Sequence, residues 1–255
     1  EVIKTLSAAG ADTSQISVIP ALGVHRPMTD DEVHQRMGSK APSNLRIESH
    51  DCDDPQKMKF LGNTSRGTPV WVNKTTAESD LIISIGCIEP HIIASFGGGY
   101  KNLIPGLAGR ATIAHNHAIN CKPDTFNMVG QPIDENPMRM DLEEGASMIG
   151  KQVFIINAVL NSNLQPVRIV AGDPIAAHRE GARTSAGIYG APMDKMADIV
   201  ITSSHPMDSD LRQGVKALAN TIRAVRPGGV MITLARAEEG TGVFGLANKK
   251  LPLGR

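Results

Sequence analysis

Short apolar runs that alternate with helix-like segments restrict the fold of this 255-residue sequence more than any other feature. Residues 29–32 (Thr-Asp-Asp-Glu) form a capping box, which predicts a helix to about Met37. The strand-length apolar runs lie at 16–23, 70–73, 81–88, 152–160 and 166–173. Strands that alternate with helices are typical of a mostly parallel sheet with helices on its faces. We therefore expect an α/β fold with a Rossmann-like sheet.

A stretch rich in glycine, proline and small residues marks a candidate hinge between two groups of predicted elements. Beyond it, apolar runs at 197–204 and 229–237 flank a predicted helix at 208–225, and the three form one βαβ unit. We expect a first domain over 1–187 and the beginning of a second α/β domain over 188–255. Because neither end of the sequence completes a recognisable element, we expect both domains to be truncated.

The charge balance and composition exclude several classes of partner and site. There are 26 basic and 26 acidic residues, so the formal net charge is +0. With no basic stripe and 3% aromatic residues, nothing favours binding to a nucleic acid or an anionic membrane. The apolar runs are too short to span a bilayer and no signal peptide opens the sequence, so we expect a cytoplasmic location. Three widely spaced cysteines (Cys52, Cys87 and Cys121) argue against a disulfide framework and a thiolate zinc site.

Two histidines follow predicted strands. His25 comes after the first apolar run, and His91 comes directly after the run at 81–88. Loops at the carboxyl ends of parallel strands line one crevice, so both imidazoles would face the same ligand if the two strands are parallel. Imidazole titrates near neutral pH and serves as a general acid or base. The pair indicates acid–base chemistry, and two idle, solvent-exposed loop histidines are the equally open alternative.

A glycine-rich turn precedes a lysine in the longest predicted irregular stretch, 89–150. Gly97, Gly98 and Gly99 allow close backbone approach to a ligand, and Lys101 follows them. Such a turn can hold a phosphate or present an amine for covalent attachment, although its spacing is not that of a P-loop. A flexible turn with a solvated lysine is the preferred explanation of this segment taken alone.

Two further pairs of side chains could bind a metal or a substrate. His115 and His117 lie two residues apart and would point the same way on an extended segment, where one or both could bind nickel, zinc or copper. Gln213 and Lys216 lie three apart on the predicted helix 208–225, so they share one face and could hold a substrate carboxylate. Solvated polar surface is the commoner explanation of each pair alone.

Read together, these segments resemble the nickel-dependent lactate racemase family. They follow the family's order over nearly the whole chain, and the His-Arg-Pro-Met-Thr and Pro-His…Gly-Gly-x-Lys motifs are specific. The matching strings are ALGVHRPMTDDE at 21–32, LGNTSRGTPVWVN at 61–73, PHIIASFGGGYKNLIPG at 90–106, HNH at 115–117, AGDPIAAH at 171–178 and RQGVKAL at 212–218.

The resemblance implies a cofactor, the nickel-pincer nucleotide, in which a pyridinium-3,5-bisthiocarboxylic acid mononucleotide holds one nickel ion. It implies that Lys101 tethers this cofactor covalently as a thioamide and that His117 is a nickel ligand. Gly98 and Gly99 would be part of the cofactor-binding turn. The domain at 1–187 would then bind the cofactor and carry the catalytic residues. Enzymes that synthesise the cofactor are the expected protein partners.

The implied reaction is an isomerisation that inverts C2 of a small 2-hydroxy acid. His25 and His91 would be the acid–base pair, one of which removes the proton of the 2-hydroxyl while hydride moves from C2 to the cofactor. Hydride then returns to either face of the planar keto acid. Gln213 and Lys216 match the positions that bind the substrate.

The sequence departs from the family pattern at the glycine turn. Where lactate racemases commonly read A-G-F-[ST]-G-G before the lysine, this chain reads ASFGGG at 94–99, which leaves open the identity of the 2-hydroxy acid. Two other functions also stay open. A non-catalytic protein that binds or carries the nickel-pincer nucleotide would not need the histidine pair. A metal-dependent hydrolase or lyase built on His115 and His117 lacks a carboxylate-rich ligand set.

Overall fold

The chain folds as a mixed α/β protein, which confirms the predicted class. The computed structural model describes residues 1–38, 45–122, 124–206 and 208–241. The helices are α1 (Val2–Ala8), α2 (Asp30–Met37), α3 (Lys74–Glu78), α4 (Arg110–Ile119), α5 (Pro137–Ser147), α6 (Ala176–Tyr189) and α7 (Leu211–Thr221). The strands are β1 (Ser17–Val18), β2 (Arg46–Ile47), β3 (Met58–Asn63), β4 (Pro69–Asn73), β5 (Leu81–Cys87), β6 (Pro90–His91), β7 (Ser95–Phe96), β8 (Gln152–Leu160), β9 (Pro166–Gly172), β10 (Ala197–Ser203) and β11 (Val225–Leu234). The 3-10 helices are η1 (Thr13–Gln15), η2 (Pro55–Lys57), η3 (Gly99–Asn102), η4 (Ile133–Glu135) and η5 (Ile222–Ala224).

The described strands are distributed over several small sheets and not over one mostly parallel sheet. β5 and β8 pair in parallel, and β9 joins β8 in the antiparallel direction. β1–β2 and β10–β11 are parallel pairs, whereas β3–β4 and β6–β7 are antiparallel. Short connections cause the antiparallel pairs, because a parallel pair needs a crossover of a dozen or more residues. The turn between β8 and β9, at residues 161–165, is too short for one.

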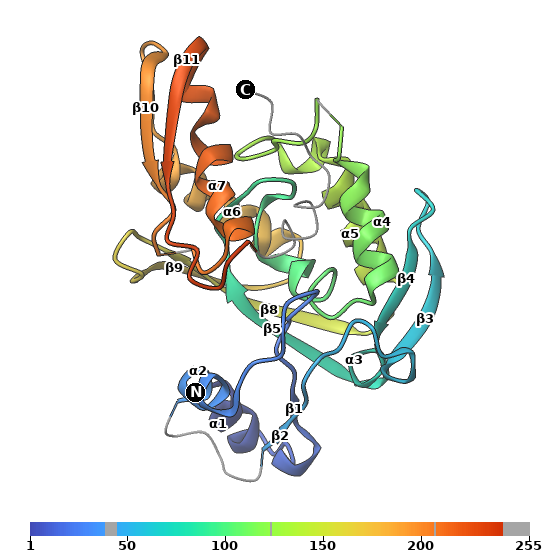
Figure 1. Cartoon of the computed structure of the whole chain (residues 1–255). Helices are drawn as coiled ribbons and strands as arrows, with labels where there is room; N and C mark the ends of the chain where they lie inside the picture. Colours follow the sequence, from blue (N-terminus) through green and yellow to red (C-terminus); the bar gives the residue numbers. More distant parts are fainter. Residues whose placement is uncertain (39–44, 123, 207, 242–255) are drawn as a thin grey trace.

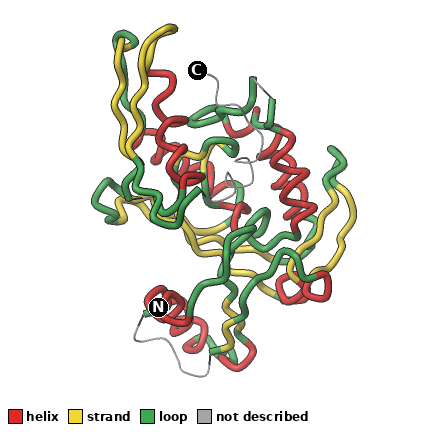
Figure 2. The backbone as a smooth tube through the Cα atoms, viewed as in Figure 1, coloured by secondary structure: helices red, strands yellow, loops and turns green. Residues whose placement is uncertain are grey.

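β5 and β8 run across the lower middle of the view, and the other sheets and the helices lie around them (Figures 1 and 2). α4 and α5 lie side by side next to the β3–β4 hairpin, and the unit of β10, α7 and β11 lies at the opposite side in this view. The N-terminal elements α1, β1, α2 and β2 form a separate lobe below β5 and β8.

Two hydrophobic clusters form the core, and one loop contributes to both. The larger cluster packs β4 against α5 and includes the fully buried Val72 and Leu142. The second lies between β8, β9 and α6 and includes Ile155 and Val170. The segment 93–107 supplies Ala94, Leu103 and Ile104 to the first cluster, and Phe96 to the second. The glycine turn therefore lies between two packed cores.

Several predicted elements occur as expected. The capping box at Thr29 is confirmed, since its hydroxyl accepts a hydrogen bond from the backbone of Glu32 and its own N–H donates to the Glu32 carboxylate. β10, α7 and β11 form the predicted βαβ unit with parallel strands. Residue 187 lies in the last turn of α6, ahead of the loop at 190–196. The division into two domains stays a prediction.

Two sequence-based expectations were wrong. The stretch 89–150 is not irregular, because it contains α4 and α5. α5 is started by Asn136, whose side chain accepts from the Arg139 N–H, and by a proline at the first helical position. The run at 16–23 forms a strand only at Ser17–Val18, since it contains Pro20, which has no N–H to continue a ladder.

A fully buried carboxylate joins α4 and α5 to the turn before β4. Asp141 accepts hydrogen bonds from the hydroxyls of Thr64 (2.5 Å) and Thr68 (2.8 Å) and from the Asn116 amide (2.7 Å). Burial of a carboxylate is costly unless it is hydrogen-bonded, and these three donors supply the compensation. Asp141 therefore fixes the position of α4 against the sheet.

The glycine turn is held from inside the protein by two side chains. The guanidinium of Arg139 donates to the carbonyl oxygens of Phe96 (3.1 Å) and Gly98 (3.2 Å). The His178 imidazole bonds through Nε2 to the carbonyl oxygen between them, that of Gly97 (2.8 Å). Both side chains are fully buried. Three consecutive carbonyls are thus tied to the interior.

Glycine is required at two positions of this turn. Gly98 and Gly99 have φ values of +74° and +62°, which L side chains rarely adopt. A Cβ at Gly99 would also lie 2.6 Å from the Arg139 guanidinium and 3.0 Å from the His178 ring. The turn can therefore approach Arg139 and His178 this closely only because it has no side chains.

We expect Gly99→Ala to destabilise the protein by about 2 kcal/mol or more, because alanine in the left-handed region alone costs roughly 1–2 kcal/mol. Gly187→Ala is the matched control, since a Cβ there meets nothing within 4 Å and the residue lies in α6. The control should be neutral or stabilising by up to about 1 kcal/mol. Urea unfolding measures both, and equal stability of the two variants would contradict the steric argument.

We expect Asp141→Ala to destabilise by about 3 kcal/mol, because it leaves three buried donors without their acceptor. Asp194→Ala, at an exposed position, should change the free energy of unfolding by no more than about 0.5 kcal/mol. The comparison is again made by urea unfolding. A small effect at Asp141 would mean that the neighbouring hydroxyls find other partners.

Candidate active site

Four of the predicted basic side chains converge on one region, although they come from different elements. They are His91 on β6, Lys101 on η3, His117 on α4 and Lys216 on α7. Lys101, Lys216 and His117 lie close enough to His91 to lower its pKa, and Lys101 and Lys216 affect each other in the same way. The described part of the chain therefore gathers these four basic groups within electrostatic reach of one another.

His91 is partly buried and neutral near pH 7. Burial lowers its pKa well below the usual 6.5, and the charges of Lys101 and Lys216 lower it further. Its Nδ1 accepts the backbone N–H groups of Ile93 (3.3 Å) and Ala94 (3.2 Å). This pattern favours the tautomer that carries its hydrogen on Nε2. His91 is thus a neutral imidazole held by its own loop.

The side-chain amine of Lys101 is an unusually weak base for a lysine. Burial lowers its pKa to about 8, and the nearby charges of Lys216 and Arg139 contribute to the same shift. The backbone N–H of Lys101 donates to the Gly98 carbonyl (3.2 Å), and this bond closes the 3-10 turn after the glycines. A substantial fraction of the Lys101 amine is therefore neutral near physiological pH, and the neutral form is the nucleophile.

The two histidines of the HNH string do not point the same way, and that expectation was wrong. They lie on helix α4 and not on an extended segment, where residues two apart point about 200° apart. His115 Nδ1 bonds to the Thr68 hydroxyl (2.8 Å). His117 faces the cluster, where burial and the charge of Lys101 lower its pKa to about 4. Its Nδ1 is buried and makes no hydrogen bond within the described residues.

The structure shows His25 on a loop that is attached two residues earlier to the segment after Lys101. β1 and β5 belong to different sheets, so the expected common rim of parallel strands was wrong. The loop is instead attached by the Gly23 N–H, which donates to the Gly106 carbonyl (2.8 Å) a few residues after Lys101. His25 is exposed on this loop.

Gln213 and Lys216 lie in consecutive turns of α7, as predicted, and both are partly buried. α7 begins at Asp210, whose side chain accepts the Gln213 N–H (2.8 Å). α7 is attached to the rest of the chain by the Asn127 amide, which donates to the Ala219 carbonyl (2.8 Å). Lys216 lies within electrostatic reach of His91 and Lys101, and Gln213 precedes it by about one turn.

Sequence reasoning missed the polar network behind the glycine turn. Glu143 accepts from Arg139 (2.6 Å) and from both terminal nitrogens of Arg179 (2.8 Å each). Burial opposes ionisation of Glu143, but these two arginines still lower its pKa. The i,i+4 spacing of Arg139 and Glu143 on a helix was an available signal. Nothing in the sequence linked that helix to His178, which received no predicted role.

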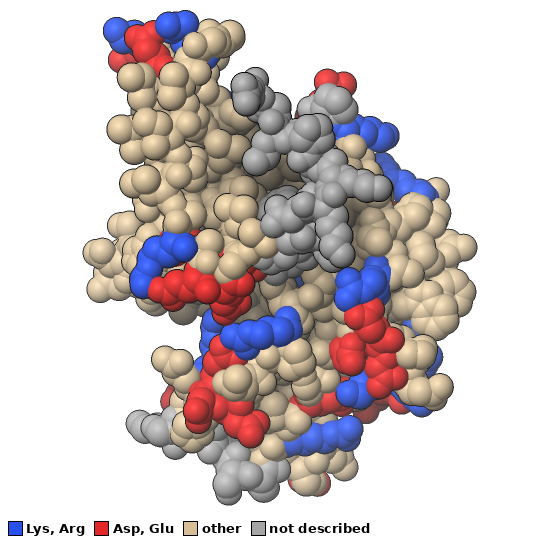
Figure 3. Space-filling model, viewed as in Figure 1, with Lys and Arg blue, Asp and Glu red and all other residues tan. Residues whose placement is uncertain are grey.

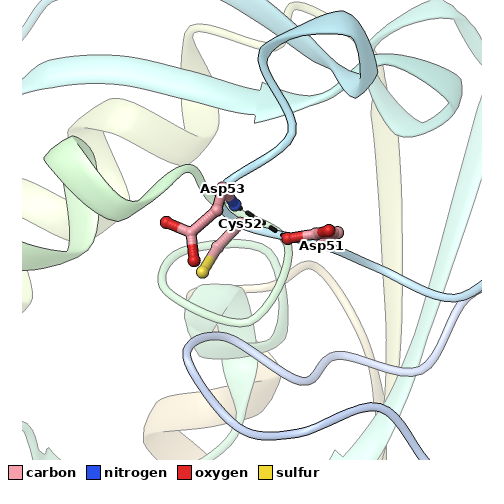
Figure 4. Close-up of side chains that lie close together, drawn as sticks. All are labelled: Asp51, Cys52 and Asp53. Atoms are coloured by element: carbon pink, nitrogen blue, oxygen red, sulfur yellow. Dashed lines mark hydrogen bonds between the residues drawn. The ribbon is translucent and has the colours of Figure 1, made fainter.

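A group of possible metal ligands that the sequence did not predict lies at the turn of residues 51–53. Oxygen and sulfur atoms of Asp51, Cys52 and Asp53 lie within 4.8 Å of one another (Figure 4). Arg110 already pairs with both carboxylate oxygens of Asp53, at 2.5 and 2.6 Å. The Asp53 N–H donates to Asp51 (2.9 Å). The carboxylate of Asp53 is therefore satisfied by an arginine, which argues against a metal at this turn.

The surface carries no large patch of one charge in the view of Figure 3, where acidic and basic side chains are mixed. The area over β10 and β11 is almost free of charge except at its tip (Figure 3). Its exposed apolar side chains are Ile199, Ile201, Val230, Ile232 and Leu234. Among the described helices, none is long and apolar enough to cross a membrane.

The comparison with known proteins finds relatives that are named lactate racemases. Residues 1–127 match the family described as lactate racemase N-terminal domain. The chain is 31% identical over 232 residues to a lactate racemase of Thermoanaerobacterium thermosaccharolyticum and 33% identical over 238 residues to one of Lactiplantibacillus plantarum. These alignments cover 90% and 91% of this chain but 54% of each relative. The chain thus spans about half the length of the relatives it matches.

Solved structures agree with the sequence comparison. The lactate racemase apoprotein of T. thermosaccharolyticum superposes with a TM-score of 0.81 at 31% identity, covering 89% of this chain and 54% of that one. A Thermotoga maritima protein superposes with a TM-score of 0.66 at 20% identity over 80% of this chain and 54% of its own, which shows a shared fold alone. By its sequence matches and its fold, the chain belongs to the lactate racemase family.

Proposed function

We propose that this protein is a racemase or epimerase that inverts C2 of a 2-hydroxy acid with the help of a nickel-pincer nucleotide. The observation that carries the proposal is the convergence of His91, Lys101, His117 and Lys216 on one region. Each belongs to a string that resembles the family, and each has a chemical property that the reaction requires. A cytoplasmic location and cooperation with cofactor-synthesis enzymes are part of the same proposal.

The residues present fit such a cofactor. His117 offers a buried imidazole nitrogen without a hydrogen-bond partner among the described residues, and burial keeps the ring neutral, which is the form that binds nickel. Lys101 offers an amine with a pKa of about 8, suitable for covalent attachment. When bound, the cofactor would supply a hydride acceptor.

The protein's own acid–base chemistry would come from His25 and His91. One imidazole, in its neutral form, would take the proton of the 2-hydroxyl as the substrate is oxidised, and the other, in its protonated form, would give a proton to the keto oxygen as the substrate is reduced again. For the opposite enantiomer the two imidazoles exchange roles. Two imidazoles on separate loops suit a reaction that must run from either face of C2.

The substrate carboxylate would bind α7. Lys216 supplies the charge, and Gln213, three residues earlier on the same helix, supplies an amide for hydrogen bonding. Because α7 belongs to the unit of β10 and β11, the substrate would lie between this unit and the cofactor-binding turn. A non-catalytic protein that binds or carries the cofactor is the second candidate function, and it has no need for His25 and His91.

We expect His25→Ala and His91→Ala each to lower the rate of inversion by about 10²–10⁴-fold, the usual contribution of a general acid or base. His34→Ala, at an exposed position on α2, is the control and should keep full activity. The assay follows enantiomers of a panel of 2-hydroxy acids with protein produced alongside the cofactor-synthesis enzymes. Bound nickel should be unchanged in all three variants. Full activity of either site variant would refute its acid–base role.

We expect an intact-mass increase on the protein produced in this way, together with about one nickel per chain for a single imidazole-ligated site. Lys101→Ala should lose the added mass, whereas Lys74→Ala, at an exposed position, should keep it. His117→Ala should lower the nickel content while the mass increase on Lys101 persists. Zinc in place of nickel, with no added mass on wild-type protein, would reject the cofactor assignment.

A further inference from the structure

We propose that His178 and Arg139 are positioning residues for Lys101, and that they act by holding the three carbonyls of residues 96–98 toward the protein interior. The inference rests on the proposed function, because it gives Lys101 its role. Neither side chain belongs to the predicted acid–base, metal or substrate groups. Their contacts connect the buried network to the backbone that carries Lys101.

The connection to Lys101 runs through one shared acceptor. The Gly98 carbonyl oxygen accepts a hydrogen bond from the Arg139 guanidinium (3.2 Å) and another from the Lys101 N–H (3.2 Å). The turn is also held on its amide side, where the Gly99 N–H donates to the Asn157 side chain (2.8 Å). A shift of the Gly98 carbonyl would therefore move the start of the 3-10 turn on which Lys101 lies.

His178 can act only as a donor to the turn. Arg179 donates to its Nδ1 (3.1 Å), so the hydrogen of the neutral ring lies on Nε2 and points to the Gly97 carbonyl (2.8 Å). Burial and the charge of Arg139 lower the pKa of His178 to about 2, so the ring stays neutral over the physiological range. The hydrogen bond to Gly97 is thus independent of pH in that range.

The network that orients these donors is itself closed. Glu143 bonds to both Arg139 and Arg179, and Arg179 also pairs with Asp134, so the buried Arg139 shares its one carboxylate with a second arginine. The charge of Arg139 contributes to the lowered pKa of both Lys101 and His91. Arg139 therefore both holds the backbone of the turn and favours the neutral amine of Lys101 and the neutral imidazole of His91.

The test compares His178→Gln with His178→Leu by hydrogen exchange of the whole chain. Glutamine keeps a donor for the Gly97 carbonyl, whereas leucine fills space without one. We expect exchange of the Gly97, Gly99 and Lys101 amides to accelerate about tenfold or more in the leucine variant, because a buried carbonyl loses its partner. In the glutamine variant it should stay within about threefold of wild type. Amides of β3 and the variant His34→Leu are the controls.

If His178 only fills space, the turn amides should exchange as slowly in the leucine variant as in the glutamine variant, or more slowly. That result would overturn the proposal. If the leucine variant does not fold, the glutamine variant decides, since acceleration of about tenfold in the turn despite a retained donor also overturns it. The mass added to Lys101 should fall in the leucine variant and return in the glutamine variant. Absence of added mass in wild-type protein would reject the proposed function, whereas the exchange result would still decide the positioning role.

Discussion

The hydrogen bonds between the buried Arg139 guanidinium and the carbonyls of the glycine turn are the interaction on which the candidate site depends. They place a charged group in the core, which is tolerable because Glu143 and two carbonyl oxygens surround it. They also require a turn without side chains, because a Cβ at Gly99 would collide with this guanidinium. The buried charge of Arg139, the left-handed backbone of the glycines and the position of Lys101 therefore depend on one another.

The site combines groups that would repel one another in water if all were protonated. His91, Lys101, His117 and Lys216 lie within electrostatic reach of one another, and the Arg139 guanidinium behind the turn adds a further positive charge. Burial resolves the conflict by keeping the two histidines neutral and weakening the base strength of Lys101. The outcome is a region that favours anionic ligands yet retains uncharged nitrogen atoms for bonding and proton transfer.

Much of this arrangement could be predicted from local patterns, and the failures have physical causes. The capping box at Thr29 and the pair on α7 depend on neighbouring residues, so short-range rules sufficed. The HNH string was read as extended, although it is the last part of a helix fixed by the buried Asp141. His178 could not be assigned because its partner, the Gly97 carbonyl, lies 81 residues away in the sequence and carries no side chain.

The division between the glycine turn and α7 has a consequence for how such proteins diversify. The turn is constrained on its inner side by Arg139 and His178, so substitutions there would disrupt the fold before they altered ligand preference. α7 belongs to a different sheet unit, and the Asn127 amide is one of the groups that attach it to the first part of the chain. On the proposed function, substrate preference would therefore vary through side chains near Gln213, on a different sheet unit from the groups that hold the turn and Lys101.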